Sequence, residues 1–95
     1  MTSVILEKIG LTKKEAEVYE ASLRLGESPV ADIIQVTQTH PQIVYRVIDS
    51  LLKKGLIAVT YRNNKKYVQA ESPRVLEKIE EEKLNELRVT IPHLM

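Results

Sequence analysis

Residues 28–70 read SPVADIIQVTQTHPQIVYRVIDSLLKKGLIAVTYRNNKKYVQA, and the pattern of this stretch decides the fold. Its first part predicts a short apolar helix over residues 29–36. We expect Ser28 to cap that helix and Pro29 to occupy its first helical position, where the missing N–H breaks no hydrogen bond. The polar residues 37–39 then link this helix to the next one.

A second, longer helix is predicted over residues 41–54. Thr39 or His40 is placed to cap it, and a proline at position 41 suits its first turn. Gly55 suits the left-handed position that follows its end. Apolar side chains recur along the helix at helical spacing, which predicts a broad core stripe of Val44, Val47, Ile48, Leu51 and Leu52.

The period of the apolar pattern then changes from helical to two. Alternation over residues 57–61 predicts one strand, and residues 66–70 predict a second strand. Residues 62–65 read RNNK and predict a turn, because asparagine tolerates positive φ angles. The segment is therefore expected to form a β-hairpin with a basic tip.

Helices are predicted on both sides of this stretch. Before it, residues 4–9 form a short helix with an apolar ridge, and the capping-box pattern of residues 12–15 opens a helix that ends at Gly26. Tyr19 is expected in the core. After it, Ser72 and the proline at 73 start a charged helix that reaches about Thr90, where Pro92 stops or kinks it.

The order helix, short helix, helix, hairpin predicts a winged helix-turn-helix. We assign the chain to a mainly α class with a small β-hairpin (α+β), with residues 1–72 as the winged domain and 73–95 as a helical dimerisation segment. Two helices joined by a tight turn cross at a large angle, so the second can present its polar face to the major groove of a DNA duplex. The hairpin would lie beside that helix and reach the flanking backbone or minor groove.

Composition narrows the function class. The chain has 95 residues, no cysteine, and only three glycines, each at an expected helix end. A disulfide scaffold, a glycine-rich phosphate loop and a membrane span are excluded on these grounds. His40 and His93 lack metal-ligand spacing, and no nucleophile-base pattern stands out. We therefore expect no enzyme activity, no metal and no cofactor, and a cytoplasmic location.

The overall charge of +1 conceals a basic centre. Residues 41–67 carry six lysines and arginines against Asp49 alone, whereas each flanking third carries a net charge of −2. Such a patch fits a polyanionic partner if the fold gathers it on one face. Double-stranded DNA is the expected partner.

Candidate base-reading residues lie at the start of the 41–54 helix. Gln42 and Arg46 are four residues apart and share one helix face, and these residue types suit adenine and guanine in the major groove. Thr39 is the third candidate. The expected phosphate contacts are polar or basic side chains beside them and at the hairpin tip: His40, Tyr45, Arg62, Asn63, Asn64, Lys65 and Lys66.

Two segments resemble a known family. Residues 11–19, LTKKEAEVY, resemble the opening of TrmB-type transcriptional regulators, a mainly archaeal winged-helix family whose domain begins with a GLTxxEAxVY run. Residues 44–57, VYRVIDSLLKKGLI, resemble the family's third helix and its exit into the wing, which MarR- and ArsR-like regulators share. The resemblance implies a DNA-binding regulator. Full-length members carry a C-terminal sugar-binding domain, so we expect this chain, which ends at residue 95, to be a stand-alone DNA-binding domain.

The last helix carries an apolar seam that favours self-association. Its residues recur at spacings of 3 and 4, as in a coiled coil. The predicted dimerisation residues are Val75, Leu76, Ile79, Leu84, Leu87 and Ile91. A homodimer would present two recognition helices to a palindromic site.

The resulting hypothesis is a dimeric, sequence-specific, double-stranded-DNA-binding transcriptional regulator. Two alternatives stay open: a winged-helix protein-interaction module within a transcription or assembly complex, and a non-specific chromatin-type DNA binder. The sequence contains no motif for a small-molecule effector and does not identify the operator.

Overall fold

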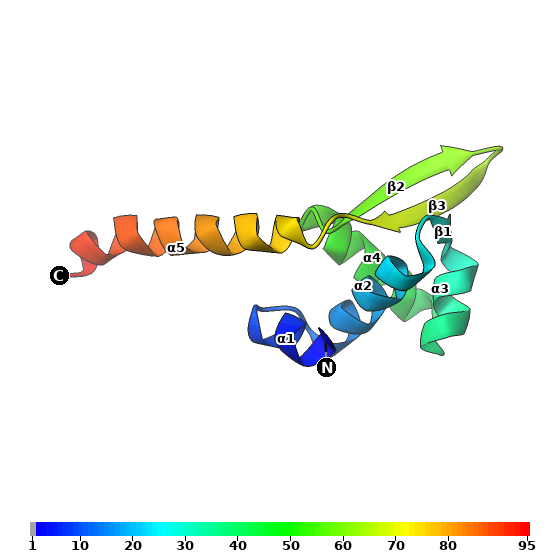
Figure 1. Cartoon of the computed structure of the whole chain (residues 1–95), viewed down its shortest axis with the longest axis horizontal. Coiled ribbons are helices and arrows are strands. Elements are labelled where there is room, and N and C mark those ends of the chain that lie inside the picture. Colours follow the sequence, from blue (N-terminus) through cyan, green and yellow to red (C-terminus); the bar gives the residue numbers. More distant parts are fainter. Residues whose placement is uncertain (1) are drawn as a thin grey trace.

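The computed structural model describes residues 2–95, and its last helix projects from the packed helices and strands that precede it (Figure 1). Side chains are described from residue 4 onward. The elements, in chain order, are α1 (Thr2–Lys8), α2 (Lys13–Leu25), β1 (Ser28–Pro29), α3 (Val30–Thr37), α4 (Pro41–Lys53), β2 (Ile57–Arg62), β3 (Lys65–Ala70) and α5 (Arg74–Leu94).

The predicted cap at Ser28 is wrong, and the sheet has a third strand. Ser28 and Pro29 form β1, which pairs antiparallel with β3 opposite Val68 and Tyr67. The sheet order is therefore β1-β3-β2. Pairing holds Pro29 extended at φ −64° and ψ 153°, so α3 begins one residue later than predicted.

The hairpin confirms the predicted turn and shortens it. Arg62 pairs with Lys65, which leaves a two-residue loop between β2 and β3. Asn63 and Asn64 have φ angles of 51° and 64°. Two successive positive φ angles match the type I′ turn that suits the twist of a hairpin, and asparagine adopts them readily.

The core lies where α2, α3 and α4 pack against the sheet. Tyr19 is fully buried, as predicted, and its hydroxyl donates to the Glu71 backbone oxygen at 3.0 Å. Burial, followed by the charge of Glu71, raises the pKa of Tyr19. The apolar stripe of α4 faces the same core, except that Leu52 is exposed. The ridge predicted for the first helix is only partly correct: Leu6 and Ile9 contact the core, but the side chains at positions 4 and 5 are exposed.

The last helix, α5, projects from this domain (Figure 1). It passes the predicted stop near Thr90 and continues through Pro92 to Leu94. A proline this close to a helix end interrupts few backbone hydrogen bonds, and the exposed surface lets water replace them. The projection explains a Cα radius of gyration of 15.2 Å, above the roughly 12 Å of a compact chain of this length.

Two features are absent from the described part of the chain, a membrane-spanning helix and a cluster of metal ligands. No helix over residues 2–95 combines the length and apolar character needed to cross a membrane. The same residues contain no cluster of three or more acidic, histidine or cysteine side chains suited to a metal ion.

Candidate nucleic-acid interface

The outward face of α4 is polar and exposed. Val44, Val47 and Ile48 turn into the core, so Gln42 and Arg46 are left on the solvent side. His40 caps the helix: its Nδ1 accepts from the Gln42 backbone N–H at 3.2 Å. The apolar stripe of α4 thus leaves two of the predicted base-reading side chains, Gln42 and Arg46, exposed in its first two turns.

Thr39 is not part of this outward face. Its side chain is only 7% exposed, and its hydroxyl donates to the Thr37 backbone oxygen at 3.2 Å. The ammonium of Lys14 lies 3.5 Å from the same hydroxyl oxygen. Thr39 therefore fixes the turn between α3 and α4, and little of its side chain is left to reach a base.

The wing, defined here as β2, β3 and the loop between them, lies against the side of α4. The Lys66 ammonium lies 6.0 Å from the centre of the Tyr45 ring, in a cation–π arrangement. Tyr45 is 51% exposed, so it belongs to the surface and not to the core. This contact brings the wing and the outward face of α4 together on one surface.

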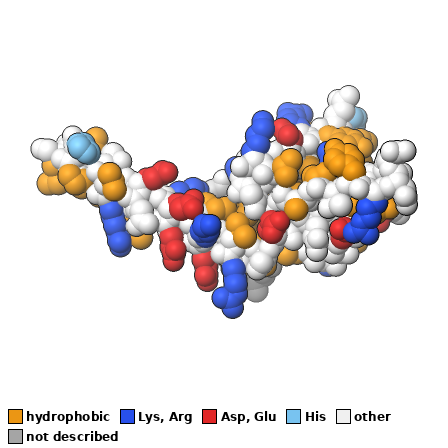
Figure 2. Space-filling view, turned by 90° about the horizontal axis from the view of Figure 1, so that it is seen from above, with side chains coloured by type: hydrophobic (Ala, Val, Ile, Leu, Met, Phe, Trp, Pro, Cys, Tyr) orange, Lys and Arg blue, Asp and Glu red, His pale blue; other side chains and the backbone are white. Residues whose placement is uncertain are grey.

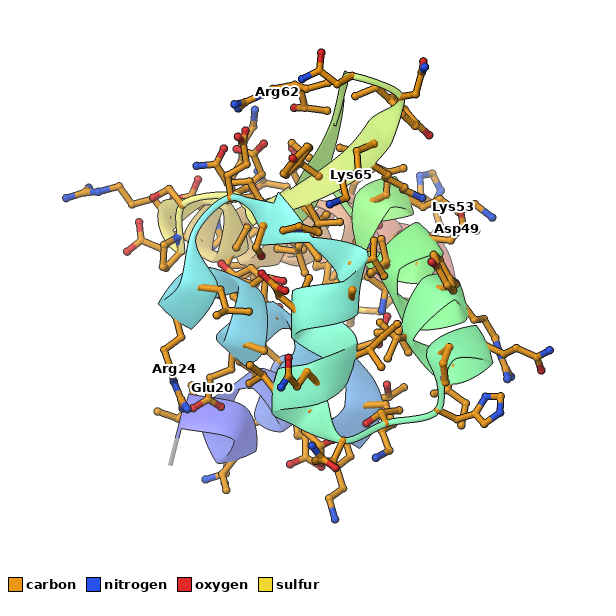
Figure 3. All side chains as sticks on the ribbon, turned by 90° about the vertical axis from the view of Figure 1, so that its right-hand side faces the viewer. Glu20, Arg24, Asp49, Lys53, Arg62 and Lys65 are labelled. Atoms are coloured by element: carbon orange, nitrogen blue, oxygen red, sulfur yellow. The ribbon has the colours of Figure 1, made fainter. Side chains whose placement is uncertain are left out.

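Arg62 has an intramolecular partner that sequence reasoning missed. Its guanidinium forms an ion pair with the carboxylate of Glu27, in the loop after α2. The same guanidinium lies over the Tyr67 ring, 5.5 Å from its centre. In Figure 3, Arg62 extends to the side of the wing away from α4. Its position at a basic tip suggested a cation that is free to bind a phosphate, but Arg62 already has a partner within the protein.

The other tip residues are exposed. Asn63 and Asn64 form the turn itself, and Lys65 follows them at the start of β3. Lys65 therefore offers its charge to solvent beside the turn. All of these side chains are predicted phosphate contacts, but the positive φ angles of the turn are enough to account for asparagine at positions 63 and 64.

A buried ionic cluster fixes the far end of α4. The carboxylate of Glu15, on α2, accepts from the Ser50 hydroxyl at 2.6 Å and from the Lys54 ammonium at 2.8 and 2.9 Å. It also closes the predicted capping box by accepting from the Thr12 backbone N–H at 2.9 Å. Burial alone raises the pKa of Glu15, but these hydrogen bonds outweigh it and lower the pKa from 4.5 to about 2.

The lysines at the end of α4 have distinct roles. Lys54 pairs with Glu15 at 2.8 Å. Lys53 is exposed and forms an ion pair with Asp49 at 3.3 Å. Such an exposed pair adds little stability. The Glu15 cluster therefore joins α4 to α2, while Lys53 stays at the surface.

Comparisons with known proteins decide the family. Residues 6–73 match the family model described as sugar-specific transcriptional regulator TrmB. The chain belongs to the TrmB family. It is 32% identical over 82 residues to the HTH-type sugar sensing transcriptional regulator TrmBL1 of Pyrococcus furiosus, a match that covers 86% of this chain and 24% of that protein. The chain thus spans about a quarter of this curated relative.

Solved structures support the fold of this TrmB-family chain. A structure of TrmBL2, described as an archaeal chromatin protein with a novel mode of DNA binding, superimposes with a TM-score of 0.84 at 26% identity. That match covers 98% of this chain and 36% of the other. The ST1889 protein from Sulfolobus tokodaii matches over the full length of both chains, with a TM-score of 0.71 at 17% identity, which shows the fold alone.

These findings confirm several predictions. The matching family model and the relative from Pyrococcus furiosus are both described as transcriptional regulators, as the resemblance implied. The winged-helix class is also confirmed, with the small sheet extended by β1. The base-reading, phosphate-binding and dimerisation roles of individual residues remain predictions.

The predicted dimerisation residues divide into two groups in this TrmB-family chain. Val75, Leu76 and Ile79 are partly buried against the protein's own core, which leaves less of their surface for a second copy. Leu84, Leu87 and Ile91 are exposed farther along α5. In Figure 2, hydrophobic side chains gather at the projecting end of this helix.

Proposed function

We propose that this TrmB-family chain binds double-stranded DNA and regulates transcription, with α4 in the major groove and the wing on the flanking backbone. The observation that carries the proposal is the contact between Lys66 and Tyr45, because it sets a basic wing beside the outward face of α4. The relative from Pyrococcus furiosus, a sugar sensing transcriptional regulator, supports the same function.

The exposed polar and basic side chains of α4 and the wing have defined roles in the proposal. Gln42 and Arg46 read base edges, since their side-chain types match adenine and guanine. His40 and Tyr45 hold phosphates beside α4. Wing cations hold flanking phosphates and set the register. Arg62 reaches a phosphate only by leaving Glu27, so we assign it the smallest share. Lys66 is the principal wing cation, and Lys65 contributes from the face of the wing that it shares with Arg62.

Dimerisation completes the proposal. The exposed residues Leu84, Leu87 and Ile91 have heptad spacing, and pairing them with a second copy would remove their apolar surface from water. A two-fold dimer would set two α4 helices about 34 Å apart, one duplex turn, and would require a palindromic site.

Fluorescence anisotropy with a labelled duplex tests DNA binding. The duplex carries the region upstream of the protein's own gene, and a scrambled duplex is its comparison. We expect salt-dependent binding that prefers the upstream duplex, with affinity falling by about 0.9 log units per phosphate contact for each tenfold rise in salt. Salt-independent binding, or no binding at low salt, would contradict the proposal, and no binding would favour a protein-interaction module.

A matched pair of variants tests the assigned face. Arg46→Ala removes a cation from the outward face of α4 and should weaken binding to the upstream duplex by about tenfold or more. Arg24→Ala removes an arginine from α2, where it pairs with Glu20 at 3.1 Å on a different side of the molecule (Figure 3). Equal effects of the two changes would show that only net charge matters.

A second candidate function has a specific observation in its favour. The structure that matches with a TM-score of 0.84 is that of an archaeal chromatin protein. If this chain acts in the same way, it would bind the upstream and scrambled duplexes equally, with the same steep dependence on salt. The comparison of the two duplexes therefore separates a sequence-specific regulator from a chromatin-type binder.

A further inference from the structure

The strand register divides the wing into two faces. Side chains directly opposite each other on neighbouring strands point to the same face, and successive pairs alternate between faces. Val59 pairs with Val68, which is fully buried, so this pair faces the core. Two residues farther along, Tyr61 pairs with Lys66 and shares that face.

The position of Lys66 shows what this face approaches. Its ammonium lies over the Tyr45 ring, so the Tyr61–Lys66 pair lies on the side of the wing that borders α4. The intervening Thr60–Tyr67 pair lies on the opposite face, where Arg62 stacks on Tyr67 and forms its ion pair with Glu27. One face of the wing is therefore anchored to the protein, and the other continues the surface of α4.

Tyr61 is the outermost large side chain on the α4 side of the wing. Its side chain is 70% exposed, although tyrosine normally buries much of its ring. With Lys66 and Tyr45 it forms a continuous row from the wing to the outward face of α4. A cation beside one aromatic ring, with a second tyrosine as its cross-strand neighbour, suits a DNA backbone, which offers a phosphate between apolar deoxyribose rings.

We propose that Tyr61 is a DNA-contacting residue, with its ring against a deoxyribose and its hydroxyl donating to a phosphate beside the one held by Lys66. The inference rests on the proposed function and adds a residue that the charge pattern did not indicate. The contact adds a ring and a hydroxyl but no cation, so its contribution to affinity should not depend on salt.

The test compares four variants by anisotropy with the duplex that the wild type binds. Tyr61→Ala should weaken binding about fivefold or more, the scale expected from losing the burial of part of an aromatic ring. It should leave the salt slope unchanged. Lys66→Ala should lower the magnitude of that slope by about 0.9, because it removes one phosphate contact. Tyr61→Phe keeps the ring and should lose about threefold through the hydroxyl alone.

Thr60→Ala is the matched control. Thr60 is exposed, adjacent in sequence and on the opposite face of the same strand, so its truncation should change affinity less than twofold. Circular dichroism and thermal unfolding establish that each variant keeps the wild-type fold, and the Tyr61→Phe protein supplies the comparison if Tyr61→Ala unfolds.

The outcomes separate the two proposals. If the wild type binds and Tyr61→Ala or Tyr61→Phe behaves like Thr60→Ala, the role of Tyr61 is overturned while the proposed function stands. If Tyr61→Ala changes the salt slope as Lys66→Ala does, the uncharged contact is also rejected. If the wild type binds no duplex at low salt, the proposed function fails and this inference fails with it.

Discussion

At the residue scale, the largest electrostatic effect lies at Glu15, away from the outward face of α4. This carboxylate is 3% exposed and receives hydrogen bonds from Thr12, Ser50 and Lys54. A carboxyl whose pKa is lower in the folded state than in the unfolded state stabilises the fold above its unfolded pKa. Its stabilising effect is lost as the pH falls from about 4.5 through about 2.

We predict that Glu15→Gln destabilises the protein at pH 7 by on the order of 3 kcal/mol, the free energy that corresponds to the pKa change. Urea unfolding at pH 7 and at pH 3 measures it. The free energy of unfolding of the wild type should fall towards that of the variant at the lower pH, whereas the free energy of unfolding of the variant should depend less on pH. Glu17→Gln is the control, because Glu17 pairs only with an exposed lysine. Parallel pH profiles for wild type and Glu15→Gln would refute the assignment.

A second residue-scale prediction concerns Ser22. Its hydroxyl oxygen is fully buried and has no hydrogen-bond partner within the described residues. Ser22→Ala removes this unsatisfied group and raises helix propensity, so it should stabilise the protein by about 0.5–1 kcal/mol. Ser50→Ala makes the same chemical change but removes a donor to Glu15, so it should destabilise. Thermal unfolding of both proteins checks the opposite signs.

At the element scale, the helix ends and the hairpin turn depend only on residues that lie close together in the sequence. The capping box forms as the spacing of Thr12 and Glu15 predicts. Gly55, which follows the C-cap residue Lys54, takes a φ of 77°. The Leu56 backbone N–H donates to the Leu51 backbone oxygen at 3.0 Å, as in a helix that ends at a glycine in the left-handed conformation. Each of these features depends on neighbours in the sequence, which is why the pattern predicts them.

The turn allows a prediction that separates geometry from DNA contact. Asn64→Gly supplies the Asn-Gly pair that type I′ turns favour, so the hairpin should be unchanged or more stable by about 0.5 kcal/mol. If Asn64 serves only the turn, DNA affinity will stay within twofold of wild type. A clear loss of affinity with unchanged thermal stability would instead support its assignment as a phosphate contact.

At the scale of the whole molecule, α5 separates into a part that belongs to the domain and a part that leaves it. Its first turns pack against the core through Val75, Leu76 and Ile79. The rest lengthens the molecule to 53 Å along its longest axis, compared with 27 and 22 Å across. An apolar seam that projects into solvent has no surface of its own chain to cover it.

We predict that this seam forms the dimer and that Leu87→Asp disrupts it, because a charge would be buried among apolar side chains. Sedimentation equilibrium should show a dimer for the wild type and a monomer for the variant. The midpoint temperature of thermal unfolding of the wild type should rise with protein concentration. Val89→Asp places the same charge two residues away, at a heptad position facing away from the seam, and should leave the dimer intact. A monomeric wild type would contradict the proposal.

Local sequence patterns were enough to predict the class of fold, helix α4, the hairpin turn and the resemblance to the family. These follow from periodicity, helix-end signals and short motifs, all of which act over a few residues. The outward placement of Gln42 and Arg46 also follows, because an apolar stripe on one side of a helix leaves the other side to solvent.

Which side chains are paired within the protein and which are exposed to a partner depends on the tertiary structure. Ser28 lies in a strand because it pairs with Val68, and Thr39 lies in a turn in which its hydroxyl bonds to the Thr37 backbone. Arg62 meets Glu27 across 35 residues of sequence, and Lys54 meets Glu15 across 39. Contacts between distant residues depend on how packed elements lie in space, and no local pattern in the sequence records that arrangement.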